Sequence, residues 1–278
     1  MLWCAQLGGK SKLGHKNVLW CAQLDEKREL GHKTENKIMI DGMKLIVITA
    51  EHFFKDEALW INQLMGDASE EYPAQDSTLF MHLRKPGSRA EEMELLIAGI
   101  DPRFYKQMVL HDHLHLAQKY NLGGVHLNLR NEQQYDSELG TCNAQQGAQT
   151  IRALQANQSD ADMKSHYWKT CRISRACHSL EEVVKYKEQC SYVTLSPIFN
   201  SISKQGYCAA FTQEELKRAK DLNVVDQKVV ALGGIDAENI AQIKELGFGG
   251  AAVLGTIWKS RTLDEARMNL KLLVNNYK

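Results

Sequence analysis

Short apolar runs alternate with polar, helix-like segments along most of the chain, from Met43 to the end. Many of the runs are rich in β-branched or aromatic residues and are followed by turn or cap residues, which is typical of buried strands that lead into helices. The predicted strands span residues 44–50, 77–84, 107–111, 124–128, 169–175, 192–198, 228–233 and 250–255. S/T-x-x-E capping boxes predict helix starts at Ser88/Glu91, Ser179/Glu182, Thr212/Glu215 and Thr262/Glu265.

Eight strands that each lead into a helix, over residues 43–278, predict an α/β fold of the (β/α)8 TIM-barrel type. A doubly wound open sheet is the alternative. We favour the barrel because the eightfold alternation is complete and no strand is followed by a G-x-G-x-x-G fingerprint. Gly247 follows a predicted helix over 237–246, where glycine commonly ends a helix in the left-handed conformation.

Two segments depart from this alternation. Within residues 1–42, LWCAQL recurs after 17 residues and so does LGHK, but two copies of so short a unit do not make a repeat fold. We predict that this part is a dispensable, disordered N-terminal extension, with a start at Met39 or Met43 and a docking peptide as alternatives. Residues 129–168 are polar and Gln-rich, helix-like only over 147–157, and are predicted to be a partly mobile insertion of the barrel domain.

The charge and the cysteines narrow the functional class. The formal net charge is zero, with 34 basic and 34 acidic residues, so no general attraction to nucleic acid or to an anionic membrane is expected. The seven cysteines are odd in number and contain no C-x-x-C pair, which disfavours a disulfide framework and a zinc site of that type and favours a cytoplasmic setting. No export signal is predicted, and the oligomeric state is open, with a homo-oligomer as one expectation.

Chemically distinctive residues gather at the predicted strand ends, which meet at one mouth in a parallel barrel. They are Arg84, Asp112, His126, His178, Ser201 to Lys204, Gly233-Gly234 and Gly255-Thr256. Two hydroxyls and an ammonium within Ser201–Lys204 suit phosphate oxygens, although an ordinary polar strand-exit loop is the equal alternative on this stretch alone. The glycines after the last two strands match a location where barrels often bind phosphate, and tight turns are the other reading.

Five segments, in order, resemble the thiamine phosphate synthase and thiazole tautomerase superfamily over roughly residues 43–278. HLRKP (82–86) is similar to Q-x-R-x-K, and HD (111–112) followed by GVHL (124–127) is similar to N-D…G-V-H-L-G-Q. CHSLEE (177–182) resembles S-x-H-S-x-E-E, SPIFNSISK (196–204) resembles G-P-I-F-x-T-x-T-K, and VVALGGIDAENI (229–240) resembles A-I-G-G-I-x-x-x-N. The ordered set is far more specific than any single motif.

The resemblance implies a thiamine biosynthesis enzyme, a transferase that couples hydroxymethylpyrimidine pyrophosphate with thiazole phosphate and releases pyrophosphate. Arg84 and Lys204 would hold pyrophosphate, and His178 occupies the position of the histidine that tautomerases use for proton transfer. Asp112 and Asn131 would bind Mg²⁺. Substrate and phosphate contacts are expected from His82, Lys85, Ser201, Ser203, Gly233, Gly234, Gly255 and Thr256.

Several family positions differ, mainly around pyrophosphate and metal. His82 replaces the family glutamine, Pro86 replaces its lysine with Lys85 adjacent, and Asn131 replaces the second acidic ligand, so a weakened Mg²⁺ site is expected. Three functions stay open: a synthase, a thiazole phosphate tautomerase acting through His178, and a non-catalytic regulatory binder of thiazole or thiamine phosphate. An ion pair of Arg84 with Asp112 and a plain cap-side position for His178 are the structural alternatives.

The remaining histidines are predicted to be structural. His111, His113 and His115 are spaced by two residues at a strand-to-helix junction, and this spacing scatters side chains rather than grouping them. His126 is predicted to be a core histidine inside the barrel.

Overall fold

The computed structural model describes residues 43–71, 77–132, 167, 171–200 and 208–277 of the 278-residue chain. The compact unit that contains all of them is Asp41–Lys278. The predicted 1–42 extension and nearly all of the 129–168 insertion, with its expected helix 147–157, lie outside the described residues, as do Ser201, Ser203 and Lys204.

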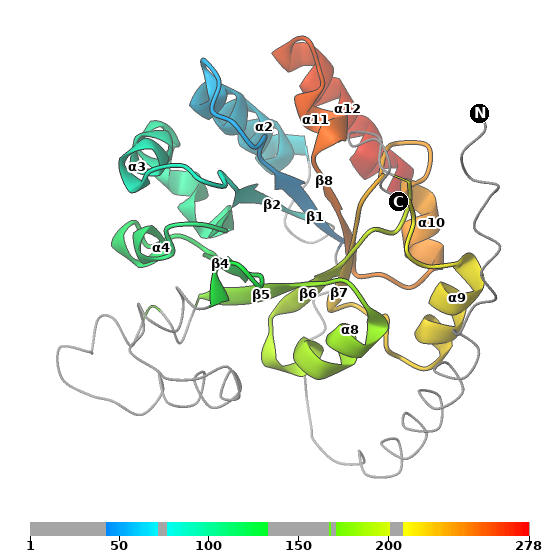
Figure 1. Cartoon of the computed structure of the whole chain (residues 1–278). Coiled ribbons are helices and arrows are strands. Elements are labelled where there is room, and N and C mark those ends of the chain that lie inside the picture. Colours follow the sequence, from blue (N-terminus) through cyan, green and yellow to red (C-terminus); the bar gives the residue numbers. More distant parts are fainter. Residues whose placement is uncertain (1–42, 72–76, 133–166, 168–170, 201–207, 278) are drawn as a thin grey trace, which may run out of the picture. The chain divides into compact units, whose positions relative to one another are not determined.

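Eight parallel strands close into a barrel in the order of the sequence (Figure 1). The strands are β1 (Met43–Ile48), β2 (Ser77–Leu83), β3 (Met108–Leu110), β4 (Gly124–Leu127), β5 (Arg172–Cys177), β6 (Tyr192–Leu195), β7 (Val229–Leu232) and β8 (Gly250–Val253). The predicted TIM barrel is therefore confirmed, and every predicted strand is present with ends shifted by at most a few residues.

The first and last strands complete the ring. Lys44 to Val47 of β1 pair with Gly250 to Val253 of β8, while the other edge of β1 pairs with β2 from Met43↔Ser77 to Ile48↔His82. Beyond β8, the indole Nε1 of Trp258 donates to the carbonyl of Ile48 at 2.6 Å. Closure leaves no free strand edge, which removes the unpaired backbone groups that an open sheet presents.

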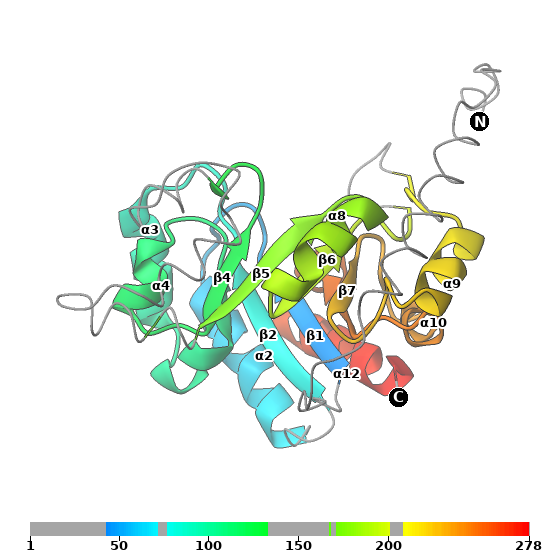
Figure 2. The same cartoon turned by 90° about the horizontal axis from the view of Figure 1, so that it is seen from below.

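The helices surround the strands, as Figure 1 and the view from below in Figure 2 show. They are α2 (Glu57–Glu71), α3 (Ala90–Gly99), η1 (Pro102–Gln107), α4 (His115–Lys119), α8 (Leu180–Tyr186), η2 (Lys187–Gln189), α9 (Gln213–Asp221), α10 (Ile240–Glu245), α11 (Gly255–Trp258) and α12 (Leu263–Tyr277). Their buried apolar residues, such as Leu216 of α9 and Leu270 of α12, are what a helix covering a sheet requires.

Most of the predicted helix starts are confirmed. Ser179 and Thr212 each accept the backbone N–H of the glutamate three residues later, and Thr262 does the same for Glu265. The start at Ser88 is wrong by one residue, because Arg89 is the cap of α3 and its N–H donates to Glu92. Gly247 ends α10 with φ +82° as predicted, although α10 is shorter than the predicted 237–246.

A buried ion pair fixes the loop between β1 and α2. The Lys85 ammonium, just beyond β2, lies 2.6 Å from Glu57 Oε1 at the start of α2, and the two side chains are 0% and 2% exposed. The same ammonium donates to the carbonyls of Ala50 and His52 at 2.8 and 2.9 Å. Burial lowers the pKa of Lys85 and raises the pKa of Glu57, and their mutual hydrogen bond opposes both shifts.

Lys85→Ala is expected to destabilise the protein by about 3–5 kcal/mol, because the buried carboxylate of Glu57 would lose its positively charged partner. The measurement is the free energy of unfolding from urea titration. Arg267→Ala, which breaks a more exposed pair with Asp67, is the matched control and is expected to cost much less stability. Equal losses in the two variants would contradict a dominant role for the buried pair.

Candidate functional site

A cavity of about 750 Å³ opens at the carboxyl ends of the strands. Its wall takes residues from the ends of all eight strands or from the loops that follow them, among them Ile48, Arg84, His111, His126, Arg175, Ser196, Leu232 and Val253. A volume of this size matches those of sites that hold small molecules. The convergence of strand ends expected from the sequence is thus the physical basis of the cavity.

Six of the predicted site residues line this cavity. They are Arg84, His178, Gly233, Gly234, Gly255 and Thr256. Segments as far apart in sequence as the β2 and β8 exits therefore meet around one volume.

Arg84 is held at both its backbone and its side chain. The Thr49 hydroxyl accepts the backbone N–H of Arg84 at 2.9 Å and donates to its carbonyl at 3.2 Å. The guanidinium contacts Glu51 Oε1 at 2.9 Å, and the Arg84 side chain keeps 21% exposure. The predicted alternative of an ion pair with Asp112 is replaced by this pair with Glu51.

Two further arginines line the cavity, and the sequence reasoning missed both. Arg130 follows β4, and Arg175 lies inside β5. Arg175 makes a two-pronged contact with Glu132, with both N···O distances at 2.9 Å, and its guanidinium lies 3.9 Å from the centre of the Tyr186 ring. A charged residue in the middle of a buried strand is rare unless it is paired. The position of Arg175 inside a predicted strand could therefore have marked it as a residue with a buried partner or a role in a site.

His178 lies at the end of β5 with its side chain exposed toward the cavity. Its Nδ1 lies 3.3 Å from both the carbonyl and the hydroxyl oxygen of Ser196, while its backbone N–H donates to Glu182 at 2.6 Å. The ring is therefore oriented from the β6 exit and can exchange a proton with a molecule in the cavity.

The glycine turn after β7 requires glycine for a steric reason. Gly233 and Gly234 have φ of +103° and +67°, and a Cβ on Gly234 would lie 2.2 Å from the carbonyl oxygen of Asn200. Because α10 begins only at Ile240, this pair forms a turn and does not open the helix directly. Across the cavity wall, Thr256 Oγ1 donates to the Ile235 carbonyl at 2.5 Å, so its hydroxyl proton is already used within the protein.

Comparisons with known proteins agree with this geometry. The solved structure of thiamine phosphate pyrophosphorylase from Bacteroides thetaiotaomicron matches with a TM-score of 0.62 and 30% identity, covering 84% of this chain and 97% of that chain. The chain belongs to the thiamine phosphate synthase family. The family model "Thiamine monophosphate synthase" matches residues 142–257.

Curated relatives match this chain over different shares of its length. The thiamine-phosphate synthase of Bacteroides thetaiotaomicron is 28% identical over 197 residues, 70% of this chain and 83% of that protein. The enzyme of the same name from Actinobacillus succinogenes is 32% identical, but the match spans only 35% of this chain and 45% of that protein. A thiamine phosphate pyrophosphorylase from Pyrococcus furiosus, at 17% identity and a TM-score of 0.56, supports the fold.

Two residues predicted to contact substrate, Lys85 and His82, are not among the residues that line the cavity in this structure. The Lys85 ammonium donates to Glu57 and to the carbonyls of Ala50 and His52, which uses all three of its N–H donors. His82 is fully buried inside the barrel, between the Tyr192 hydroxyl at 2.6 Å from its Nε2 and His111 at 2.8 Å from its Nδ1.

The Asn131 side chain, predicted to be a metal ligand, bonds to backbone groups in this structure. Its Nδ2 donates to the carbonyls of His111 and His126 at 2.7 and 2.8 Å, and its Oδ1 accepts the N–H of Asn128 at 2.7 Å. The side chain is buried and ties the β3 and β4 exits together. Asp112 is different, because it is partly exposed and its single side-chain bond within the described part of the chain is a 3.3 Å contact from the Lys85 N–H.

The family-implied Mg²⁺ fits the carboxylate of Asp112, which is an oxygen donor and is partly exposed. Among the described residues, Asp112 belongs to no group of three or more histidine, cysteine or acidic side chains that could hold a metal ion together. Mg²⁺ commonly takes one or two carboxylates and completes its shell with substrate phosphates and water. A single carboxylate beyond the end of β3 is compatible with that arrangement.

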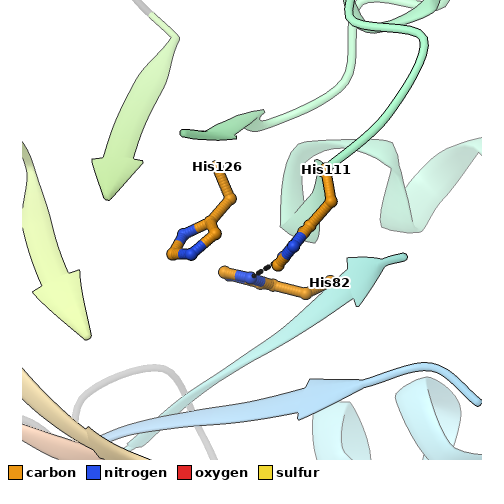
Figure 3. A group of neighbouring side chains, drawn as sticks. All are labelled: His82, His111 and His126. Atoms are coloured by element: carbon orange, nitrogen blue, oxygen red, sulfur yellow. Dashed lines mark hydrogen bonds between the residues drawn. The ribbon is translucent and has the colours of Figure 1, made fainter. Parts of the chain in front are cut away.

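Three histidines meet inside the barrel (Figure 3), and two of them, His111 and His126, line the cavity. His82 lies on β2, His111 directly follows β3, and His126 lies on β4. His126 is buried, which confirms the prediction of a core histidine. His111 and His126 stack with ring centres 4.3 Å apart. As expected, His113 and His115 do not join them, because His113 bonds to Ser88 and His115 is exposed.

Burial keeps this group neutral. It lowers the pKa of His82 and of His111 well below the ordinary value and that of His126 to about 3, with the nearby Arg175 and Arg84 adding to the shift for His126. The sequence reasoning missed the group because its members are separated by 29 and 15 positions.

No helix in the described part of the chain is long and apolar enough to cross a membrane.

Gly234→Ala is expected to cost more stability than Gly87→Ala. Both positions have positive φ, which costs an alanine about 1–2 kcal/mol, but only at Gly234 does a Cβ also meet backbone, whereas at Gly87 nothing lies within 4 Å. Thermal melting compares the two variants directly. An equal drop in Tm would mean that the Asn200 carbonyl moves away freely and that the turn is not sterically fixed.

Proposed function

We propose that this chain is a thiamine phosphate synthase, which joins hydroxymethylpyrimidine pyrophosphate to thiazole phosphate and releases pyrophosphate. The observation that carries the proposal is the cavity itself, where three arginine side chains share the wall with two glycine-containing turns. Such a wall suits two anionic groups at once, the leaving pyrophosphate and the phosphate of the acceptor.

The reaction breaks the bond between the pyrimidine methylene carbon and the pyrophosphate oxygen, and the electron pair leaves with pyrophosphate. The thiazole nitrogen then forms the new C–N bond with its lone pair. Negative charge grows on the leaving oxygen, so a guanidinium that is already positioned stabilises the transition state more than the bound substrate. Arg84 fits this role because Thr49 and Glu51 hold it at the cavity wall.

Mg²⁺ at Asp112, when bound, would add charge neutralisation for the pyrophosphate. Asp112 follows β3 and Arg84 follows β2, on neighbouring strands. The Gly233-Gly234 turn and the first residues of α11, Gly255 and Thr256, are proposed to receive the thiazole phosphate through backbone N–H groups. Contacts from Ser201, Ser203 and Lys204 stay predictions from the sequence, since they lie outside the described residues.

A thiazole phosphate tautomerase is the second candidate. The observation that favours it is the exposed ring of His178 in the cavity, oriented by Ser196 and able to act as a proton carrier. A non-catalytic binder of thiazole or thiamine phosphate would use the same glycine turns and show no turnover.

Arg84→Ala is expected to lower kcat/KM for synthesis by about 10²-fold or more, because it removes a charge that acts on the developing leaving group. Steady-state synthesis from the two substrates with Mg²⁺ is the measurement. Arg103→Ala, an exposed arginine on η1, is the control and is expected to leave the rate unchanged. A synthase rate that survives Arg84→Ala would remove Arg84 from the proposed site.

His178→Asn separates the two catalytic candidates. It keeps a side chain that can hydrogen bond near Ser196 and removes the titratable ring. For a tautomerase, proton exchange at the thiazole carbon is expected to fall by about 10²–10⁴-fold; for a synthase, coupling is expected to fall much less. Isotope exchange and coupling assays on the same preparations distinguish the outcomes, and exchange at the wild-type rate would eliminate the tautomerase role of His178.

A further inference from the structure

The three buried histidines offer nitrogen atoms to one point inside the barrel. One ring nitrogen from each of His82, His111 and His126 lies within 4.8 Å of the others (Figure 3). Bonds of about 2.0–2.1 Å to a tetrahedral ion place such nitrogens about 3.3 Å apart. Small ring rotations would close the longest separation and widen the 2.8 Å contact between His82 and His111.

The outward nitrogens of two rings already have protein partners. His82 Nε2 lies 2.6 Å from the Tyr192 hydroxyl, and His126 Nδ1 lies 2.9 Å from Ser174 Oγ, which in turn lies 3.2 Å from the Val125 carbonyl. The second ring nitrogens, Nδ1 of His82 and Nε2 of His126, are therefore the atoms that could bind an ion at the centre of the group. Partners on the far nitrogen are what fix the tautomer and the ring orientation of metal-ligating histidines.

The surroundings suit a cation bound by neutral donors. The two guanidiniums that act on His126 are each paired with a carboxylate, Arg84 with Glu51 and Arg175 with Glu132. Their positive field at the centre is thereby reduced.

We propose that His82, His111 and His126 bind one divalent transition-metal ion of the zinc class, with an open position toward the cavity. Imidazole nitrogens suit Zn²⁺, Co²⁺, Ni²⁺ or Fe²⁺ far better than Mg²⁺, which takes oxygen ligands. Three histidines with one open position is a known arrangement for catalytic zinc. His111 and His126 line the cavity, so the fourth ligand would be water or a heteroatom of a bound molecule.

This site is separate from the Mg²⁺ position proposed at Asp112, because it uses nitrogen donors inside the barrel instead of a carboxylate at its rim. It therefore does not depend on the proposed synthase activity, and it is tested without substrates.

The test is Co²⁺ and Zn²⁺ binding to the full-length protein after removal of metals. One equivalent of Co²⁺ is expected to give the visible absorption bands of a four-coordinate nitrogen site, and Zn²⁺ is expected to displace it and raise the Tm. His126→Gln and His82→Gln are expected to weaken binding by at least 10-fold. Tyr192→Phe removes an outer partner and is expected to weaken it by about 10–100-fold.

His115→Ala is the matched control, since His115 is exposed and lies outside the group, and it is expected to bind as the wild type does. Melting of each metal-free variant shows whether it folds, and His111→Gln gives a further variant if one of the others does not. The proposal fails if folded His126→Gln binds Co²⁺ like the wild type, if no visible bands appear, or if a thiolate charge-transfer band assigns the ion to cysteine.

Discussion

The pairing of β1 with β8 is the constraint on which the rest of the molecule depends. A parallel sheet closed in this way sends every strand end to the same rim, so residues from distant parts of the sequence meet without any local signal that joins them. Arg84, His178 and the turns after β7 and β8 share a cavity for this reason. If the ring were open, the β8 turn and the β1 exit would no longer be neighbours.

Inside the barrel, buried apolar side chains give way to buried polar side chains toward the carboxyl ends of the strands. The barrel interior contains an apolar cluster that includes Ile46, Phe80 and Val230. His82 lies two residues beyond Phe80 on β2, and the other two histidines come from the end of β3 and from β4. Buried polar groups are costly unless they are bonded. Here Tyr192 and Ser174 bond to two of the rings, while the Asn131 amide donates to backbone carbonyls. The cavity floor is accordingly held by many directional contacts, which favours fixed side-chain positions.

The sequence was sufficient for the strands, for most helix caps and for the family, because these depend on local patterns or on ordered motifs. It was insufficient where the answer depended on which way a side chain turns after a strand ends. Lys85 and Arg84 are adjacent, yet one enters a buried ion pair and the other faces the cavity. Asn131 matched a metal position by alignment but bonds to the backbone, and the partners Glu51 and Glu132 could be found only from the three-dimensional fold.

The carboxylates that hold Arg84 and Arg175 also set a condition on what the cavity accepts. Each guanidinium already has an anionic neighbour at 2.9 Å, so an incoming anion competes with an internal one instead of meeting a bare charge. A singly charged, weakly coordinating ion such as chloride gains little from that exchange. A multiply charged phosphate ester can bridge an arginine and another donor at once, and its advantage grows with its charge. The internal ion pairs thus make the affinity of the cavity for an anion depend on the charge of that anion, in addition to its shape.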